Sequence, residues 1–180
     1  LEAAGIYAAA FRIADAAIVP IRSLMYAAYA SFFRHGAGGV GGSSRFALRI
    51  LPFAAAYGVA AGVVLVLMPY AVPWILGNDY EAAGEVLLLF ALLPLLHAVY
   101  NIGGDALTAS GHQSARSTAH MIGAALMVIG CLVLIPRYGA LGAAAANVAS
   151  HAALATATWA LVLWHRRRDV PASAVRGGAA

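Results

Sequence analysis

Apolar residues run along the chain in long stretches, interrupted at a few points by short groups of glycine, proline and polar residues. A mostly apolar stretch of about 18 residues or more is long enough to cross a hydrocarbon layer roughly 30 Å thick as a helix. The pattern therefore predicts an all-α, polytopic bundle of about five membrane-spanning helices within residues 1–168. We expect these helices at about residues 4–33, 46–76, 82–110, 116–136 and 140–164.

Residues that end or bend helices separate these stretches. The predicted connections are a Gly/Ser-rich connector at Arg34–Ser44, an acidic turn at Asn78–Glu81, a turn at Gly111–Gln113 and another at Pro136–Gly139. Pro69 and Pro73 are expected to break or kink the far end of the second helix. Residues 169–180 are expected to form a disordered cytoplasmic tail.

Composition supports the membrane assignment and narrows the function. Apolar residues make up 63% of the chain and charged residues 10%, against about 25% charged in an average soluble domain. The arginines are scattered at helix ends without a continuous basic face, which argues against nucleic acid as a partner. The single cysteine, Cys131, excludes an intrachain disulfide and a cysteine zinc cluster. No catalytic or metal-binding motif is present, so we expect neither an enzyme nor a cofactor.

The distribution of arginine predicts the orientation. If the five helices alternate in direction, most arginines fall on one side: Arg34, Arg45, Arg49, Arg116 and Arg166–Arg168. The other side carries Asp79, Glu81 and only Arg137. The positive-inside rule then places the C-terminus in the cytoplasm and Leu1 outside. Because no earlier helix is present to carry Leu1 across, we expect further spans upstream.

The first predicted helix carries polar residues at steps of three and four, which places them on one stripe. The stripe consists of Arg12, Asp15, Val19, Arg22, Tyr26 and Tyr29. A charge deep in a bilayer costs about 2.5–3.5 kcal/mol on insertion scales, so we expect the stripe to face a polar cavity or protein. Alternatively, Arg12 and Asp15 form a structural (i, i+3) pair. Arg22 lacks a carboxylate at such spacing, which makes it a candidate for an anionic ligand, with snorkelling as the alternative.

A second polar face is predicted on the third helix. His97, Asn101, Asp105 and Thr108 share a narrow arc, which can line the same cavity and sense protons or an ion. Alternatively, His97 and Asn101 are interhelical hydrogen-bonding groups, and Asp105 is an interfacial residue or the partner of an arginine.

The fifth helix also carries polar residues on one face, namely Asn147, Ser150, His151 and Thr158. They lie beside the small residues Gly142, Ala143 and Ala146. Because small residues allow close helix approach and polar ones join helices, we interpret this face as a packing surface.

Several segments, in this order, resemble motifs of one transporter family. GIYAAAFRIAD (Gly5–Asp15) is similar to the G-x-Y-x-x-A-x-R opening of a C-lobe helix in bacterial polysaccharide flippases. Met68–Leu92 resembles their helix, proline break, L-G-x-x-Y turn and next helix. LTASGHQSARS, followed by Leu134–His151, resembles their A-x-G turn and I-P-x-x-G-x-x-G-A-A hairpin. The family is the lipopolysaccharide/O-antigen flippase group, in the superfamily that includes multidrug and toxic-compound extrusion transporters.

The resemblance implies most of the C-terminal lobe of a two-lobed transporter in the bacterial inner membrane. Such proteins move undecaprenyl-pyrophosphate-linked oligosaccharide between leaflets for polysaccharide and lipopolysaccharide biosynthesis. The implied partners are the lipid-linked oligosaccharide, the bilayer and a missing N-terminal lobe. Arg12 and Arg22 map to cavity arginines that meet the headgroup. No family motif matches His97, Asn101 or Asp105, which together with Asp15 complete the predicted substrate-binding set.

Three other readings remain open. A cation-coupled multidrug antiporter of the same superfamily would depend more on Asp15 or Asp105 than on the arginines. A membrane-embedded glycosyl- or acyltransferase would need a catalytic acid or metal site elsewhere in a longer protein. A membrane scaffold without transport activity is the third.

Overall fold

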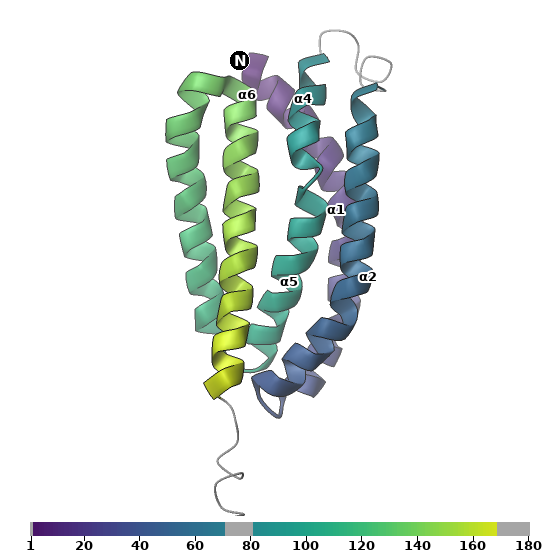
Figure 1. The fold of residues 1–180 in the computed structure, drawn as a ribbon, viewed down its shortest axis with the longest axis vertical. Helices are drawn as coiled ribbons and strands as arrows, with labels where there is room; N and C mark the ends of the chain where they lie inside the picture. The colour runs from purple at the N-terminus through teal and green to yellow at the C-terminus, as the bar shows by residue number, and fades with distance from the viewer. Residues whose placement is uncertain (1, 71–80, 169–180) are drawn as a thin grey trace, which may run out of the picture.

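The computed structural model describes residues 2–70 and 81–168, and these residues form helices joined by short turns, without a strand among them. In chain order the elements are α1 (Glu2–Gly36), α2 (Val40–Leu67), the 3-10 helix η1 (Met68–Tyr70), α4 (Glu81–Phe90), α5 (Leu93–Ala109) and α6 (Gln113–Arg168). The predicted all-α bundle is confirmed (Figure 1). The acidic turn near residue 78, Pro73 and the tail at 169–180 lie outside the described residues.

The described part of the chain contains four helical stretches long and apolar enough to cross a membrane. The longest, α6, reverses at Gly139 (φ 55°, ψ −127°), so residues 113–138 and 140–168 form two antiparallel arms (Figure 1). Many large apolar side chains point outward, among them Phe53 at 75% and Leu132 at 72% exposure. A surface this apolar is typical of a membrane protein, because lipid solvates it where water does not.

The turn between α1 and α2 is much shorter than predicted. Instead of a connector at Arg34–Ser44, α1 continues to Gly36 and α2 begins at Val40. A Cβ atom on Gly42 would lie 2.1 Å from the carbonyl oxygen of His35. Glycine therefore allows the start of α2 to touch the end of α1, and this packing outweighs the low helix propensity of the segment.

The third predicted helix is interrupted where the sequence analysis expected it to be continuous. Helix α4 ends at Phe90 and α5 begins at Leu93. Pro94 explains the break, because it has no backbone N–H and its ring clashes with the carbonyl of the residue four positions earlier. The second helix changes to η1 at Met68, so the break or kink expected near Pro69 is present; residues 71–76 of the predicted helix lie outside the described residues.

The last two predicted helices are longer than expected. The first arm of α6 begins at Gln113 and continues through Pro136, and the second arm continues to Arg168. The chain reverses at Gly139 because its positive φ angle suits a residue without a side chain.

Helix α5 lies at the centre of the bundle and packs against α1, α2 and α6. Half of the apolar stretch that includes α5 is buried, against 11% of that in α6. Close approach of α2 depends on Gly58 and Gly62, where a Cβ atom would lie 2.7 Å from Leu95 Cα and 2.5 Å from the carbonyl oxygen of Ala91, respectively. Small residues serve helix packing in membranes in this way.

We predict that Gly58→Ala destabilises the protein by about 1–3 kcal/mol, because the added methyl group forces α2 away from α5. Gly41→Ala is the matched control, since Gly41 lies in the same helix with open space around its Cα. Thermal unfolding of both variants in detergent micelles measures the difference. Equal unfolding temperatures for the two variants would contradict this account of the α2–α5 contact.

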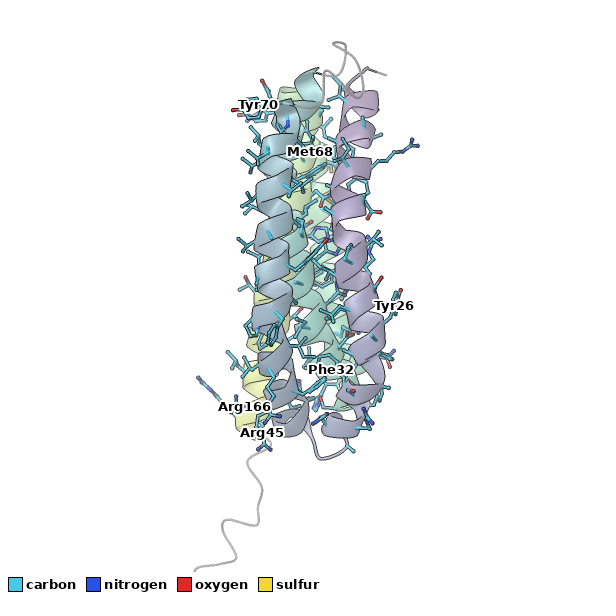
Figure 2. All side chains as sticks on the ribbon, turned by 90° about the vertical axis from the view of Figure 1, so that its right-hand side faces the viewer. Tyr26, Phe32, Arg45, Met68, Tyr70 and Arg166 are labelled. Atoms are coloured by element: carbon cyan, nitrogen blue, oxygen red, sulfur yellow. The ribbon has the colours of Figure 1, made fainter. Side chains whose placement is uncertain are left out.

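The two ends of the bundle differ in charge. Figure 2 shows Arg45 and Arg166 at one end and Met68 and Tyr70 at the other. The described residues at the arginine-bearing end, within 30–50, 106–118 and 160–168, include no carboxylate. This asymmetry is the one used to predict the orientation, which stays a prediction.

Candidate functional site

A cavity of about 400 Å³ lies between α1, α5 and the first arm of α6. Its described lining residues are mostly polar or aromatic: Arg22, Met25, Tyr26, Tyr29, His97, Tyr100, Asn101, Asp105 and Arg116. The structure thus brings together four of the six predicted substrate-binding residues, from two helices distant in sequence. Of the other two, Asp15 contacts a lining residue and Arg12 does not line the cavity.

On α1, Arg22 forms a salt bridge with Asp15, seven residues earlier. Seven residues are about two helical turns, so the two side chains share a face. Spacings of three and four had suggested, as an alternative, a pair between Asp15 and Arg12. In the structure Arg12 is exposed and forms no salt bridge with a described residue. The Arg22 side chain remains 43% exposed, so its guanidinium is accessible from the cavity.

On α5, the predicted polar face is present. His97, Asn101 and Asp105 all line the cavity. Two of them also make local hydrogen bonds: the Asn101 amide nitrogen donates to the carbonyl oxygen of His97 at 2.9 Å, and Tyr100 Oη lies 3.2 Å from His97 Nδ1. These bonds lie within α5 and hold the His97 and Asn101 side chains in position. The His97 ring also contacts the second arm of α6 by stacking.

Asp105 forms a second salt bridge, which joins α5 to α6. Arg116 Nη1 donates to Asp105 Oδ1 at 2.8 Å and to Thr108 Oγ1 at 3.0 Å. The Asp105 side chain is only 7% exposed and that of Arg116 25%. Gly104 makes room for the guanidinium, because a Cβ atom there would lie 2.9 Å from Arg116 Nε. One alternative from the sequence, that Asp105 is the partner of an arginine, is confirmed.

Arg116 is the charged lining residue that was not predicted from the sequence, because it was assigned to the basic end of the bundle. Its position eleven residues after Asp105, across the turn at Gly111, was the available signal. In a helical hairpin, residues equally far from the turn face each other, so a buried acid before the turn indicates a basic partner after it.

Three histidines, one from α5 and one from each arm of α6, lie around the Tyr100 ring. The His97 ring stacks on His151 with 4.8 Å between centroids, and Tyr100 lies 5.7 Å from His151 and 5.8 Å from His120. The cluster therefore connects α5 with both arms of α6. The sequence placed His151 on a packing surface and His120 near the cytoplasmic edge, without relating either residue to His97.

The other polar residues of the second α6 arm act in packing, as predicted. Asn147, Ser150 and Thr158 are buried. The Asn147 amide nitrogen donates to Tyr7 Oη at 2.9 Å, which joins the second arm to α1. Trp159 Nε1 donates to the carbonyl oxygen of Val99 at 2.9 Å, which joins the same arm to α5.

The cavity offers hydrogen-bond donors to an anion, and each of its guanidinium groups is also paired with a carboxylate. Its described lining carries two guanidinium groups, from α1 and α6, and one carboxylate, from α5. Guanidinium binds phosphate oxygens through paired, charge-assisted hydrogen bonds. Arg116 uses Nη1 for Asp105 and Thr108, which leaves its other N–H groups for a ligand.

Comparison of the chain with protein-family models, curated proteins and solved structures finds no match. The resemblance to flippases therefore rests on the sequence motifs alone, and any inference about function rests on the cavity.

Proposed function

We propose that this chain is most of the C-terminal lobe of a flippase that moves undecaprenyl-pyrophosphate-linked oligosaccharide across the bacterial inner membrane by alternating access. The observation that carries the proposal is the convergence of Arg22 and Arg116, from different helices, on one cavity within an apolar bundle. The product would serve polysaccharide or lipopolysaccharide biosynthesis. We place the C-terminus in the cytoplasm, because the positive-inside rule puts the arginine-bearing end of the bundle on that side.

The physical requirement for such a protein is clear. A pyrophosphate and its sugars lose their hydrogen bonds to water if they enter hydrocarbon, at a cost of several kcal/mol for each unpaired group. A polar cavity replaces those bonds with Arg22, Arg116, Asn101 and the tyrosine hydroxyls. The apolar side chains that cover the outside of the bundle allow the isoprenoid tail to remain in the bilayer.

The exposed side of α1 is where a second lobe would complete the cavity. Tyr26 lines the cavity and is nevertheless 81% exposed, and Val19 on the same stripe is 48% exposed. Figure 2 shows Tyr26 pointing away from the bundle. Rocking of one lobe against the other would then open the cavity to each side in turn. Pro20, within α1, is a position at which this helix can bend.

The two salt bridges affect anions and cations differently, which favours the flippase over the multidrug antiporter: a guanidinium paired with a carboxylate keeps free N–H donors for an anion. Binding of an organic cation requires a carboxylate that is free to meet it. Asp15 is paired with Arg22, and Asp105 with Arg116, so a cation would have to displace a guanidinium in each case.

A binding experiment separates these two functions. The purified chain in nanodiscs of neutral lipid is titrated with farnesyl pyrophosphate and, separately, with tetraphenylphosphonium, an organic cation. We expect saturable binding of the pyrophosphate that weakens with salt, and none of the cation. The reverse result would overturn the flippase proposal in favour of the antiporter.

A further inference from the structure

A second cavity of about 340 Å³ adjoins the first and shares two lining residues with it, Tyr29 and Arg116. Its other described lining residues are Thr108, Gln113, Ser117 and His120. These residues surround the turn between α5 and α6, so the second cavity lies nearer to the arginine-bearing end of the bundle than the first. The two cavities thus lie next to each other along α1, α5 and the first arm of α6.

The chemistry of the second cavity differs from that of the first. Its described lining has no carboxylate. Apart from Arg116 and His120, it offers the hydroxyl groups of Tyr29, Thr108 and Ser117 and the amide of Gln113. Thr108 Oγ1 is occupied, since it donates to the carbonyl oxygen of Gly104 and accepts from Arg116, both at 3.0 Å. Gln113 and Ser117 make no side-chain hydrogen bond to any described residue. Their groups are both donors and acceptors, and they match the hydroxyl groups of a sugar.

Tyr29 stands where the two cavities meet. Its ring packs edge-on against Phe33, with 5.0 Å between centroids, which holds it in position. The side chain is nevertheless 41% exposed. A tyrosine ring combines an apolar face with a polar tip, so it can lie against the C–H face of a sugar while its hydroxyl reaches a polar group.

We propose that the second cavity binds the sugar joined to the pyrophosphate, while the first cavity binds the pyrophosphate itself. This assignment rests on the proposed function and adds the orientation of the headgroup. The phosphates lie between Arg22 and Arg116, and the sugar extends past Tyr29 towards Gln113 and Ser117. Arg116 lines both cavities and contacts the junction of phosphate and sugar. Apart from Arg116 and His120, the described lining is uncharged and polar, which suits a polyhydroxylated group next to the anion.

Two pyrophosphate diesters of equal charge, which differ in the group on the second phosphate, test the orientation. The full chain in neutral-lipid nanodiscs is titrated with farnesyl pyrophosphate methylated on its terminal phosphate and with farnesyl pyrophosphoryl-N-acetylglucosamine. A few hydrogen bonds made only by the sugar should make the second ligand bind about tenfold tighter. The double variant Gln113→Leu, Ser117→Ala is expected to lose this preference. Ser114→Ala, an exposed position on the same turn that does not line either cavity, is the matched control.

The outcomes distinguish the two proposals. If the wild-type chain binds both ligands with equal affinity, the sugar site is overturned and the pyrophosphate site stands. The same conclusion follows if the double variant keeps the tenfold preference, provided that thermal unfolding shows the variant to be folded. If the wild-type chain binds neither ligand, the proposed function fails and the sugar site with it.

Discussion

Asp105→Ala is expected to lower the free energy of unfolding by about 3 kcal/mol, because it leaves the Arg116 guanidinium partly buried without its carboxylate. The carboxylate accepts from Arg116 at 2.8 Å, and this salt bridge is the charged link between α5 and the first arm of α6. Unfolding of the purified protein, followed by circular dichroism during titration with sodium dodecyl sulfate, measures the change.

A second variant distinguishes the loss of the pair from the loss of packing. Replacing both partners, Asp105→Leu with Arg116→Met, removes both charges while it keeps most of the side-chain volume. We expect this double variant to recover most of the lost stability, because neither charge is then left unpaired. An Asp105→Ala protein as stable as the wild type would show that Arg116 finds another partner or water. The proposed position of the guanidinium in the cavity would then be wrong.

On the proposed function, Arg22→Ala in the full-length protein is expected to lower the display of surface glycan at least tenfold at equal protein abundance. A charge-assisted hydrogen bond contributes about 1.5–3 kcal/mol, and 1.4 kcal/mol corresponds to a tenfold change in affinity. The fold should tolerate this substitution, since Asp15 is 34% exposed and water can solvate its carboxylate once Arg22 is removed. Quantitative staining of surface glycan in cells that lack their own flippase measures the effect.

Arg12→Ala is the matched control for this experiment. Arg12 has the same side chain on the same helix, but it is exposed and lies outside the cavity lining. We expect the Arg12 variant to keep close to full display, and Arg22→Lys to give an intermediate value because lysine keeps the charge without the planar fork. Equal defects in the Arg12 and Arg22 variants would remove the headgroup role from Arg22.

The polar face of α5 shows what the helical repeat alone can predict. The spacing of His97, Asn101 and Asp105 placed them on one arc, and all three line the cavity. The same reasoning failed for the partner of Asp15, because an arginine two turns away reaches it as well as one a single turn away. Side-chain length and flexibility decide between such partners, and the sequence pattern does not contain that information.

Helix boundaries were likewise predictable from the sequence only in part. The break at Pro69 was predicted from the absent N–H group of proline, whereas Pro94 was overlooked within an apolar stretch. The segment around residue 40 was assigned to a connector because Gly/Ser-rich segments are typical of flexible linkers. In the folded chain Gly42 lets two helix ends touch, and the contact compensates for the weak helix propensity of the segment.

The sequence by itself determined the class of the protein: long apolar stretches can be stable only as helices in a membrane, where every backbone polar group must be paired within the chain. It also determined which face of each helix is polar, since that follows from the helical repeat. Only the tertiary structure decided which polar faces meet. Arg116 joined Asp105, and His151 joined His97, because helix packing brings together residues whose separation along the chain carries no periodic signal.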